Sequence, residues 1–316
     1  MGLIHKQQIR IACIGGANVD RKARTIEKTR LYTSNPVTVS ESSGGVARNV
    51  AENLSRLGCR PEMFTCVGED KEGFWLRSDM ELDGIDTAGV VTTKGGRTGT
   101  YTALLDNDGE MIVAMADMAI YDEMTESWLE RRWPRIESCD AVFADTNLPA
   151  PTLRYAIERC AAEGRLLAID PVSSAKAAKL PPRLDGVELL FPNREEAEAL
   201  TGLPARTPEE CRAVCERLRE RGARRVVLTL GEEGVYYSEP DAFGSLPPYP
   251  AEVADVTGAG DALTAATLFA LLQGATLADA CRYGLAAASL TVRTTDTVCR
   301  TLRFEQLESI VKGRPT

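Results

Sequence analysis

The chain has 316 residues and a mass of 34.3 kDa, enough to bury a full hydrophobic core without disulfides or metals. Its 37 basic and 46 acidic residues give a net charge of −9, which argues against a nucleic-acid partner, because binding a phosphate backbone requires clustered lysine and arginine. The single histidine, His5, excludes a Ser-His-Asp triad and a multi-histidine zinc site. Chemistry must therefore rely on carboxylates, lysine, cysteine, hydroxyls or backbone amides.

The cysteines and the hydropathy pattern predict the compartment. Nine cysteines are scattered along the chain without a CxxC motif, which is typical of reduced thiols in a cytosolic protein. The sequence shows no signal peptide and no apolar run near the ~18 residues that a membrane span needs. We therefore expect a soluble cytoplasmic protein that does not bind membranes.

Short apolar runs recur along the chain and predict strands buried on both faces of a parallel sheet. The predicted strands are residues 9–14, 63–67, 141–144, 166–169, 187–191 and 226–230. The segments between them have helical spacing, and the predicted helices are 44–58, 72–83, 152–163, 194–201, 208–221, 258–273 and 276–293. Because strands alternate with helices, we predict one α/β domain over residues 1–316, built from stacked βαβ units.

Two stretches depart from this alternation. Residues 18–40 are polar and rich in arginine, lysine and threonine, whereas residues 98–116 alternate around a turn at 106–109, as a hairpin does. Together they predict a small β-sheet lid inserted into the α/β domain. The alternative is that they are two unrelated surface loops.

Residues 255–261 combine a glycine-rich turn with the start of an apolar helix. Gly258, Ala259 and Gly260 leave their backbone amides unobstructed, and amides at a helix N-terminus bind anions. Asp261 would lie in the first turn beside this anion hole, where it can accept a proton from a hydroxyl. The alternative is that Asp261 only caps the helix. Neither a Walker-type P-loop motif nor GxGxxG is present to compete as a nucleotide site.

Five motifs in a fixed order resemble those of the PfkB (ribokinase-like) carbohydrate and nucleoside kinases, and together they cover roughly residues 9–300. The motifs lie at residues 15–20, 44–49, 193–196, 229–231 and 255–261. The resemblance implies a ribokinase-like three-layer α/β/α domain with a mostly parallel central sheet and a small β-sheet lid. It also implies an ATP-dependent kinase with a small-molecule substrate and a homodimer formed through the lid.

Within this family, four segments are similar to the pseudouridine kinases: residues 34–37, 42–49, 145–147 and 170–176. The similarity implies phosphorylation of the 5′-hydroxyl of pseudouridine. One alternative is another PfkB-type kinase, acting on ribose, an aldonate or an ordinary nucleoside. A second is a non-catalytic regulator that binds a nucleotide or a sugar. A third is a Rossmann dehydrogenase, which the missing GxGxxG motif argues against.

The resemblance also assigns roles to residues. Asp261 is expected to be the general base, with Gly258, Ala259 and Gly260 as the anion hole. The substrate is expected to contact Asp20, Gly44, Gly45, Asn49, Asn147, Asp170 and Lys176. The nucleotide phosphates are expected to contact Asn193, Glu196, Thr229 and Gly231. Glu196 would hold Mg²⁺ through water, and Asp255 and Thr257 would bind a monovalent cation such as K⁺.

Plainer interpretations stay open for several of these residues. Asn193 and Glu196 also have the spacing of a capping box, which is compatible with phosphate binding. Asn49 and Lys176 could be solvent-facing helix residues, Gly44 and Gly45 simple turn glycines, and Thr229 the end of a strand before a hairpin. In the predicted lid, Arg21, Lys22 and Arg24 could contact phosphate, although charged residues on a solvated or dimer-facing strand explain them better.

Overall fold

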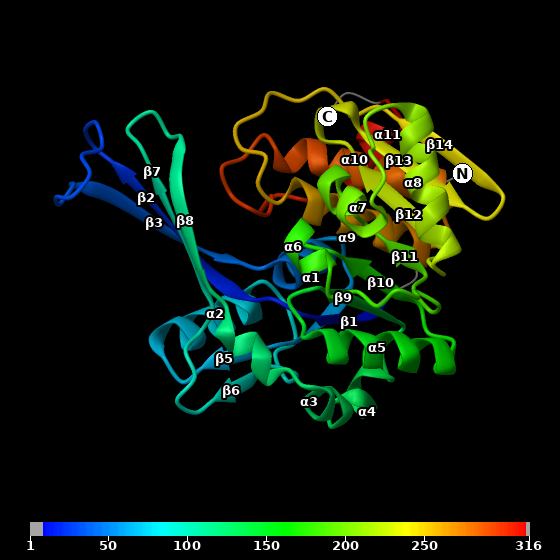
Figure 1. Ribbon diagram of the computed structural model, residues 1–316, viewed down its shortest axis with the longest axis horizontal. Coiled ribbons are helices and arrows are strands. Elements are labelled where there is room, and N and C mark those ends of the chain that lie inside the picture. Colours follow the sequence, from blue (N-terminus) through cyan, green and yellow to red (C-terminus); the bar gives the residue numbers. More distant parts are fainter. Residues whose placement is uncertain (1–8, 314–316) are drawn as a thin grey trace.

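The computed structural model describes residues 9–313, which form a central eight-stranded sheet with helices on both faces (Figure 1). In spatial order the strands are β14 (Ala242–Leu246), β13 (Val235–Glu239), β12 (Arg225–Thr229), β11 (Leu189–Leu190), β10 (Leu167–Asp170), β9 (Ala141–Asp145), β1 (Arg10–Ile14) and β4 (Arg60–Phe64). The strands from β12 to β4 pair in parallel, and β13 and β14 continue the sheet as an antiparallel edge.

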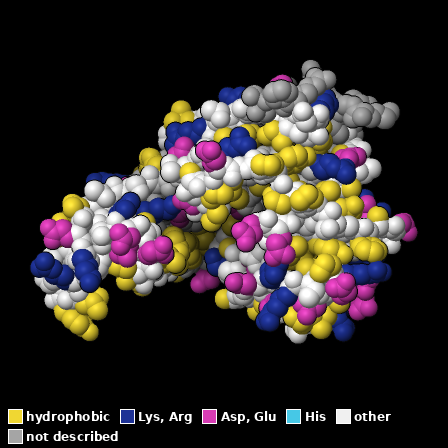
Figure 2. Space-filling model, turned by 90° about the horizontal axis from the view of Figure 1, so that it is seen from above, with side chains coloured by type: hydrophobic (Ala, Val, Ile, Leu, Met, Phe, Trp, Pro, Cys, Tyr) yellow, Lys and Arg dark blue, Asp and Glu magenta, His cyan; other side chains and the backbone are white. Residues whose placement is uncertain are grey.

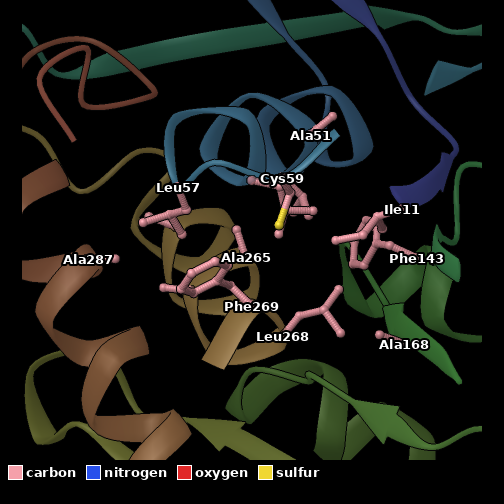
Figure 3. Close-up of a cluster of buried hydrophobic side chains, with 14 of the residues drawn as sticks. Ile11, Ala51, Leu57, Cys59, Phe143, Ala168, Ala265, Leu268, Phe269 and Ala287 are labelled. Atoms are coloured by element: carbon pink, nitrogen blue, oxygen red, sulfur yellow. The ribbon is translucent and has the colours of Figure 1, made fainter. Parts of the chain in front are cut away.

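The two faces of this sheet carry separate hydrophobic clusters, because its strands are apolar on both sides. One face packs against α1 (Val46–Arg56), α2 (Lys71–Leu82), α9 (Ala259–Leu272), α10 (Leu277–Thr291) and α11 (Phe304–Val311). The other packs against α3 (Glu126–Glu130), α4 (Trp133–Ile136), α5 (Ala150–Glu163), α7 (Arg194–Thr201) and α8 (Pro208–Glu220). In Figure 3, Ile11 and Phe143 from neighbouring strands lie near Leu268 of α9. The result is the predicted three-layer α/β/α architecture.

A second sheet projects from the main body (Figure 1), and Figure 2 shows it as a separate lobe. It consists of β3 (Val37–Gly44), β2 (Asn18–Thr25), β7 (Thr100–Leu105) and β8 (Met111–Asp117), in that order. β2 and β7 pair in parallel, and the outer pairs are antiparallel. The two segments predicted to form a lid do form one sheet, so the interpretation as unrelated loops is wrong. We call this four-stranded sheet the lid.

The structure differs from the sequence-based expectation in its short elements. The run at 63–67 is divided at Thr65 between β4 and β5 (Cys66–Gly68), and β5 pairs with β6 (Val91–Thr93) in a separate two-stranded sheet. The 3₁₀ helices η1 (Ala119–Glu123) and η2 (Gly231–Glu233), the one-turn helix α6 (Ser174–Ala177), and the helices α3, α4 and α11 were not predicted. All nine cysteines are free and buried. Within residues 9–313, no helix is long and apolar enough to cross a membrane.

Candidate active site

The predicted site residues gather at the carboxyl ends of the central parallel strands, beneath the base of the lid. Asp145 ends β9, Asp170 ends β10 and Thr229 ends β12. Asp20 lies on β2, which enters the lid directly after β1, and Asp261 lies in the first turn of α9. Open α/β sheets place their ligands at this edge, because the loops that follow the strands meet there.

Asp261 is held by a residue from a different helix. Its Oδ2 accepts a hydrogen bond from Nδ2 of Asn49 on α1, at 2.8 Å. The N-cap of α9 is Gly258 and no side chain caps the helix, so the interpretation of Asp261 as a capping residue is wrong. The pKa of Asp261 is raised to about 7, chiefly by burial and also by the Asp145 and Asp20 carboxylates, although the Asn49 bond and the Arg48 charge oppose the rise. A carboxylate with such a pKa is suited to accept a proton near neutral pH.

The turn before α9 requires glycine at one position and leaves open space at another. Gly258 has φ +78°, and a Cβ there would lie 1.9 Å from the carbonyl oxygen of Thr297. At Gly260, by contrast, a Cβ would meet nothing within 4 Å. The Ala259 amide donates to the Val256 carbonyl at 3.3 Å, whereas the amides of Gly260 and Asp261 have no carbonyl partner among residues 9–313. These two amides therefore face the open space at the start of the helix.

Asp145 forms the floor of the site, although the sequence analysis assigned it no role. The carboxylate is fully buried, and its Oδ2 accepts bonds from the amides of Gly16 and Ala47, both at 2.9 Å. Its Oδ1 accepts from the amide of Asn147, also at 2.9 Å. One side chain thus joins the end of β9, the turn after β1 and the start of α1. The available signal was its position: an acidic residue that ends a buried parallel strand lies at the ligand edge.

The two glycines before α1 lie close to other groups of the site. Gly45 has φ +98°, and a Cβ there would lie 2.4 Å from the Gly16 carbonyl oxygen. A Cβ on Gly44 would meet the Asp20 carboxylate, a side chain that can turn away, so the backbone itself requires glycine only at position 45. Oδ1 of Asp20 accepts a bond from Asn18 at 2.6 Å, and burial raises the pKa of Asp20. Asn49 is only 4% exposed, so its interpretation as a solvent-facing residue is also wrong.

Lys176 and Asp170 lie on the opposite wall. Nζ of Lys176 donates to Oδ1 of Asn147 at 2.6 Å, and burial lowers the pKa of this lysine, so it is not a freely solvated helix residue. Asp170 accepts from the amide of Val172 at 2.7 Å, and burial together with Glu196 and other carboxylates raises its pKa well above the usual range. Val172 itself has φ +63°, a conformation that β-branched residues rarely adopt.

Asn193 and Glu196 start α7 as a capping box beside Thr229. The two Glu196 oxygens accept bonds from the amide and the side-chain nitrogen of Asn193, at 2.9 and 2.8 Å. Each of these oxygens keeps a second lone pair, which can accept a hydrogen bond from a metal-bound water molecule. Across residues 9–313, no group of three or more His, Cys, Asp and Glu side chains is arranged to hold a metal ion. The pair therefore fits a hydrated Mg²⁺ contacted through water, and does not fit one held directly by the protein.

An apolar cavity of about 620 Å³ opens next to the start of α9. Thr229, Gly231 and Gly260 are among its lining residues. The apolar walls come from α10 and from the segment before the glycine turn, and include Tyr249, Val253, Val256, Leu285, Ala288 and Val292. These wall residues could not be predicted from the sequence, because an apolar residue has the same pattern whether it faces the core or a cavity. A cavity of this size is suited to a nucleotide-sized ligand.

The predicted lid cations all have partners in the protein. Lys22 donates to Oδ2 of Asp255 at 3.0 Å and so connects the lid to the glycine turn. Arg21 pairs with Glu41 and Glu72, both at 2.7 Å, and Arg24 donates to the Asn107 carbonyl within the lid. The other oxygen of Asp255 accepts bonds from the amide and hydroxyl of Thr257. The carboxylate predicted to bind a monovalent cation is thus already paired with an ammonium group.

Residues 8–300 match the pfkB family of carbohydrate kinases. The chain belongs to this family. A pseudouridine kinase of Escherichia coli (strain K12) is 33% identical over 281 residues, which is 89% of each protein. A solved carbohydrate kinase from Agrobacterium tumefaciens is also 33% identical, with a TM-score of 0.86 over 98% of this chain and 99% of that one. The structure of Arabidopsis thaliana ribokinase complexed with ribose and ATP is 20% identical, with a TM-score of 0.83 over 97% of this chain and 99% of that one.

These comparisons confirm the resemblance on which the sequence analysis relied. The pfkB match spans all five motifs, and the structural neighbours confirm the ribokinase-like fold with its mostly parallel sheet and small lid. The pfkB-family chain therefore carries the fold over its described length, with the predicted site residues at the carboxyl edge of the sheet.

Proposed function

We propose that this pfkB-family protein is an ATP-dependent kinase that phosphorylates the 5′-hydroxyl of pseudouridine to give pseudouridine 5′-phosphate. The observation that carries the proposal is the place of Asp261: its carboxylate accepts a bond from Asn49 at the open start of α9, next to Gly260, which lines the apolar cavity. We call the polar side chains gathered at the strand ends, among them Asp20, Asn49 and Asp170, the polar pocket of the proposed substrate. The similarity to the Escherichia coli pseudouridine kinase supports the choice of substrate.

The polar pocket would bind the nucleoside. Carboxylates and amides suit a ribose, because each can meet paired hydroxyls. The contacting residues are Asp20, Gly44, Gly45, Asn49, Asn147, Asp170 and Lys176. Lys176, whose Nζ donates a hydrogen bond to Asn147, is the candidate contact for the edge of the nucleobase.

ATP would bind as the second substrate, with its adenosine in the apolar cavity and its phosphates toward Thr229 and Gly231. Asn193 and Glu196 would hold Mg²⁺ through water molecules. When bound, this ion neutralises charge on the phosphates. Phosphoryl transfer depends mainly on positioning and charge stabilisation, so a protein without an active-site histidine can perform it.

Asp261 would act as the general base. It accepts the proton of the 5′-hydroxyl while that oxygen forms a bond to the γ-phosphorus, and the bond from this phosphorus to the β-phosphate oxygen breaks to release ADP. The amides of Gly260 and Asp261 would stabilise the negative charge on the transferred group, whereas the predicted Ala259 amide already donates to the Val256 carbonyl. A base of this kind contributes ~10²–10⁴ in rate.

We also propose that residues 1–316 form a single kinase domain with lid segments 18–40 and 98–116, working in the cytoplasm as a homodimer through the lid. Exposed apolar side chains on the lid, such as Val39, Val113 and Met115, support a protein partner there. Asp255 and Thr257 would bind K⁺ only if Lys22 shares or leaves the Asp255 carboxylate. Comparing turnover in KCl with turnover in tetramethylammonium chloride tests this site.

A substrate panel tests the function. Purified protein with Mg²⁺ and ATP is given pseudouridine, uridine, ribose or an aldonate, and products are identified by ³¹P NMR. We expect pseudouridine 5′-phosphate as the main product. If another substrate is phosphorylated and pseudouridine is not, the proposed substrate is wrong but the proposed kinase activity holds. Binding of ATP and nucleoside by thermal shift, with no turnover of any substrate, would favour the non-catalytic regulator.

A further inference from the structure

Arg48 lies next to Asn49 on α1, and its side chain is only 4% exposed. One terminal nitrogen of its guanidinium donates to Oδ1 of Asn49 at 3.2 Å. Nδ2 of the same asparagine donates to Oδ2 of Asp261 at 2.8 Å. The Asn49 amide is therefore held at both ends, with its oxygen toward a cation and its nitrogen toward a carboxylate.

The reversed orientation of this amide is unfavourable at both ends. It would set the Asn49 NH₂ group against the guanidinium, where both groups are donors. It would also set the carbonyl oxygen against the Asp261 carboxylate, where both groups are acceptors. The positive group on the far side of Asn49 thus selects the orientation in which Asp261 receives a hydrogen bond.

Arg48 is itself anchored by carboxylates from two helices. It pairs with Glu52 at 2.7 Å on its own helix, and with Asp79 at 3.2 Å and Asp83 at 2.8 Å from the α2 region. The Ser43 hydroxyl at the base of the lid also bonds to Asp79. These contacts fix the guanidinium, so it cannot follow Asn49 if the amide rotates.

The charges around Asp261 give Arg48 a second effect. Carboxylates face Asp261 from three strands: Asp145 on β9, Asp20 on β2 and Asp170 on β10, with Glu196 of α7 acting on Asp170. Arg48 opposes them, and its charge favours the ionised form of both Asp261 and Asp20. On the opposite wall, Lys176 faces Asp145.

We propose that Arg48 is a positioning residue for phosphoryl transfer: it holds the Asn49 amide so that one oxygen of Asp261 accepts the Asn49 hydrogen bond and the other is presented to the substrate hydroxyl. The proposal rests on the proposed kinase function, in which Asp261 is the base. Arg48 itself touches neither substrate.

Arg56 provides a matched control. It lies on the same helix and pairs with two of the same carboxylates, Glu52 and Asp83, but its remaining bond goes to the Arg300 carbonyl and not to the site. If the ion cluster only stabilises the fold, Arg48→Met and Arg56→Met should have similar effects. If Arg48 positions the base, only Arg48→Met should change catalysis.

The kinetic test compares Arg48→Met, Arg48→Lys and Arg56→Met with the wild-type protein. We expect Arg48→Met to lower kcat about tenfold with both KM values nearly unchanged, since one hydrogen bond from a charged group is lost. The acid limb of its kcat–pH profile should move to higher pH, because the positive charge of Arg48, which favours ionised Asp261, is gone. Arg48→Lys should keep the limb in place and recover part of kcat. Equal loss in Arg48→Met and Arg56→Met, without a shifted limb, would overturn the proposal.

Two further measurements test the proposal. The first does not need Arg48→Met and so remains usable if that variant folds poorly, and the second needs no substrate and so remains usable if the substrate is different. In an Asn49→Ala background, Arg48→Lys should change kcat less than twofold, because the two residues act through one amide. The ¹³C shift of the Asp261 carboxyl should titrate at higher pH in Arg48→Met than in Arg56→Met, with no substrate present. An unchanged midpoint would contradict the proposal even if the kinase function holds, and a raised midpoint would support it even if no panel substrate is phosphorylated.

Discussion

The polar pocket contains Asn49, which binds Asp261, and the apolar cavity is lined by the neighbouring residue Gly260, but the two are built in opposite ways. In the pocket, Asp145, Asp20 and Asn49 are already bonded to protein partners, and glycines are packed so closely that a Cβ on Gly44 would lie 2.1 Å from Asp20. The cavity is about 620 Å³ of space with mostly apolar walls. The pocket thus fixes reacting groups before substrate arrives, whereas the cavity selects its ligand by shape and apolar contact.

This difference follows from the proposed roles of the polar pocket, which holds the reacting groups, and of the apolar cavity, which holds the adenosine. Carboxylates buried near one another are stable only if other groups bond to them, so the pocket needs its internal network. Preorganised dipoles and bases also act more strongly than mobile ones, because they do not reorganise during the reaction. The cavity needs only to hold a planar base and leave the phosphates free, for which side-chain packing suffices.

The largest expected effect comes from a substitution in the glycine turn before α9. Gly260→Ala should lower kcat by about 10²-fold, because the added methyl enters open space where the transferred phosphate would lie. Its melting temperature should equal that of the wild-type protein, since the methyl touches no protein atom. Steady-state kinetics and calorimetry together measure both effects.

Gly258→Ala is the matched comparison for that variant. Its Cβ would clash with the Thr297 carbonyl, so this protein should lose melting temperature as well as activity. If Gly260→Ala retains full activity, the space before α9 does not hold the phosphate.

Asp261 makes the pocket sensitive to pH. Burial raises its pKa to about 7 in the ligand-free protein, and only the ionised form accepts a proton, so kcat/KM should be half-maximal near pH 7 and fall about tenfold per unit at lower pH. Because burial also raises the pKa of Asp20, the same profile should show an additional acidic loss. A kcat/KM that stays constant well below pH 7 would contradict the assigned base.

The cavity should respond through binding and not through chemistry. Ala288→Phe on α10 fills part of the space, and misfit of this kind should raise KM for ATP about tenfold. KM for the nucleoside and the melting temperature should stay close to those of the wild-type protein. A larger change in KM for the nucleoside than for ATP would mean that the apolar cavity binds the nucleoside and the polar pocket binds ATP.

The smallest effect is expected from the lid contact. Lys22→Met removes an ion pair to Asp255 whose two side chains are 42% and 25% exposed, and such pairs contribute at most ~1 kcal/mol. We therefore expect a change in KM of no more than about fivefold. Arg24→Met, which removes only a bond within the lid, is the control and should have no effect on kinetics. A loss of kcat beyond 10²-fold in Lys22→Met would instead make this lysine a phosphate contact.

Much of the fold and the reacting half of the site could be predicted, because their signals are local. The helix predicted at 194–201 coincides with Arg194–Thr201, and that at 258–273 with Ala259–Leu272 to within one residue. The Asn193–Glu196 capping box marks the start of the first helix and the glycine turn marks the start of the second, and neither signal needs a distant partner. The glycines and Asp261 follow one another in seven residues, so their spacing alone indicated an anion site.

The features that escaped prediction depend on contacts between distant segments. Asp145 becomes the floor of the site only because the Gly16 and Ala47 amides, about 100 residues or more away in sequence, point at it. The strand at 63–67 divides because Cys66 pairs with Val91 in another sheet. The cavity needs α10 to face the segment before the glycine turn, and the apolar pattern of that helix is the same whether it faces a cavity or the core.

Single-turnover phosphoryl transfer by Asp261→Asn tests the central claim most directly. Asparagine keeps the size of the side chain but cannot take the proton, so transfer from Mg-ATP to pseudouridine should slow by at least ~10²-fold while ATP binding stays nearly unchanged. A transfer rate equal to that of the wild-type protein would contradict the assignment of Asp261 as the base.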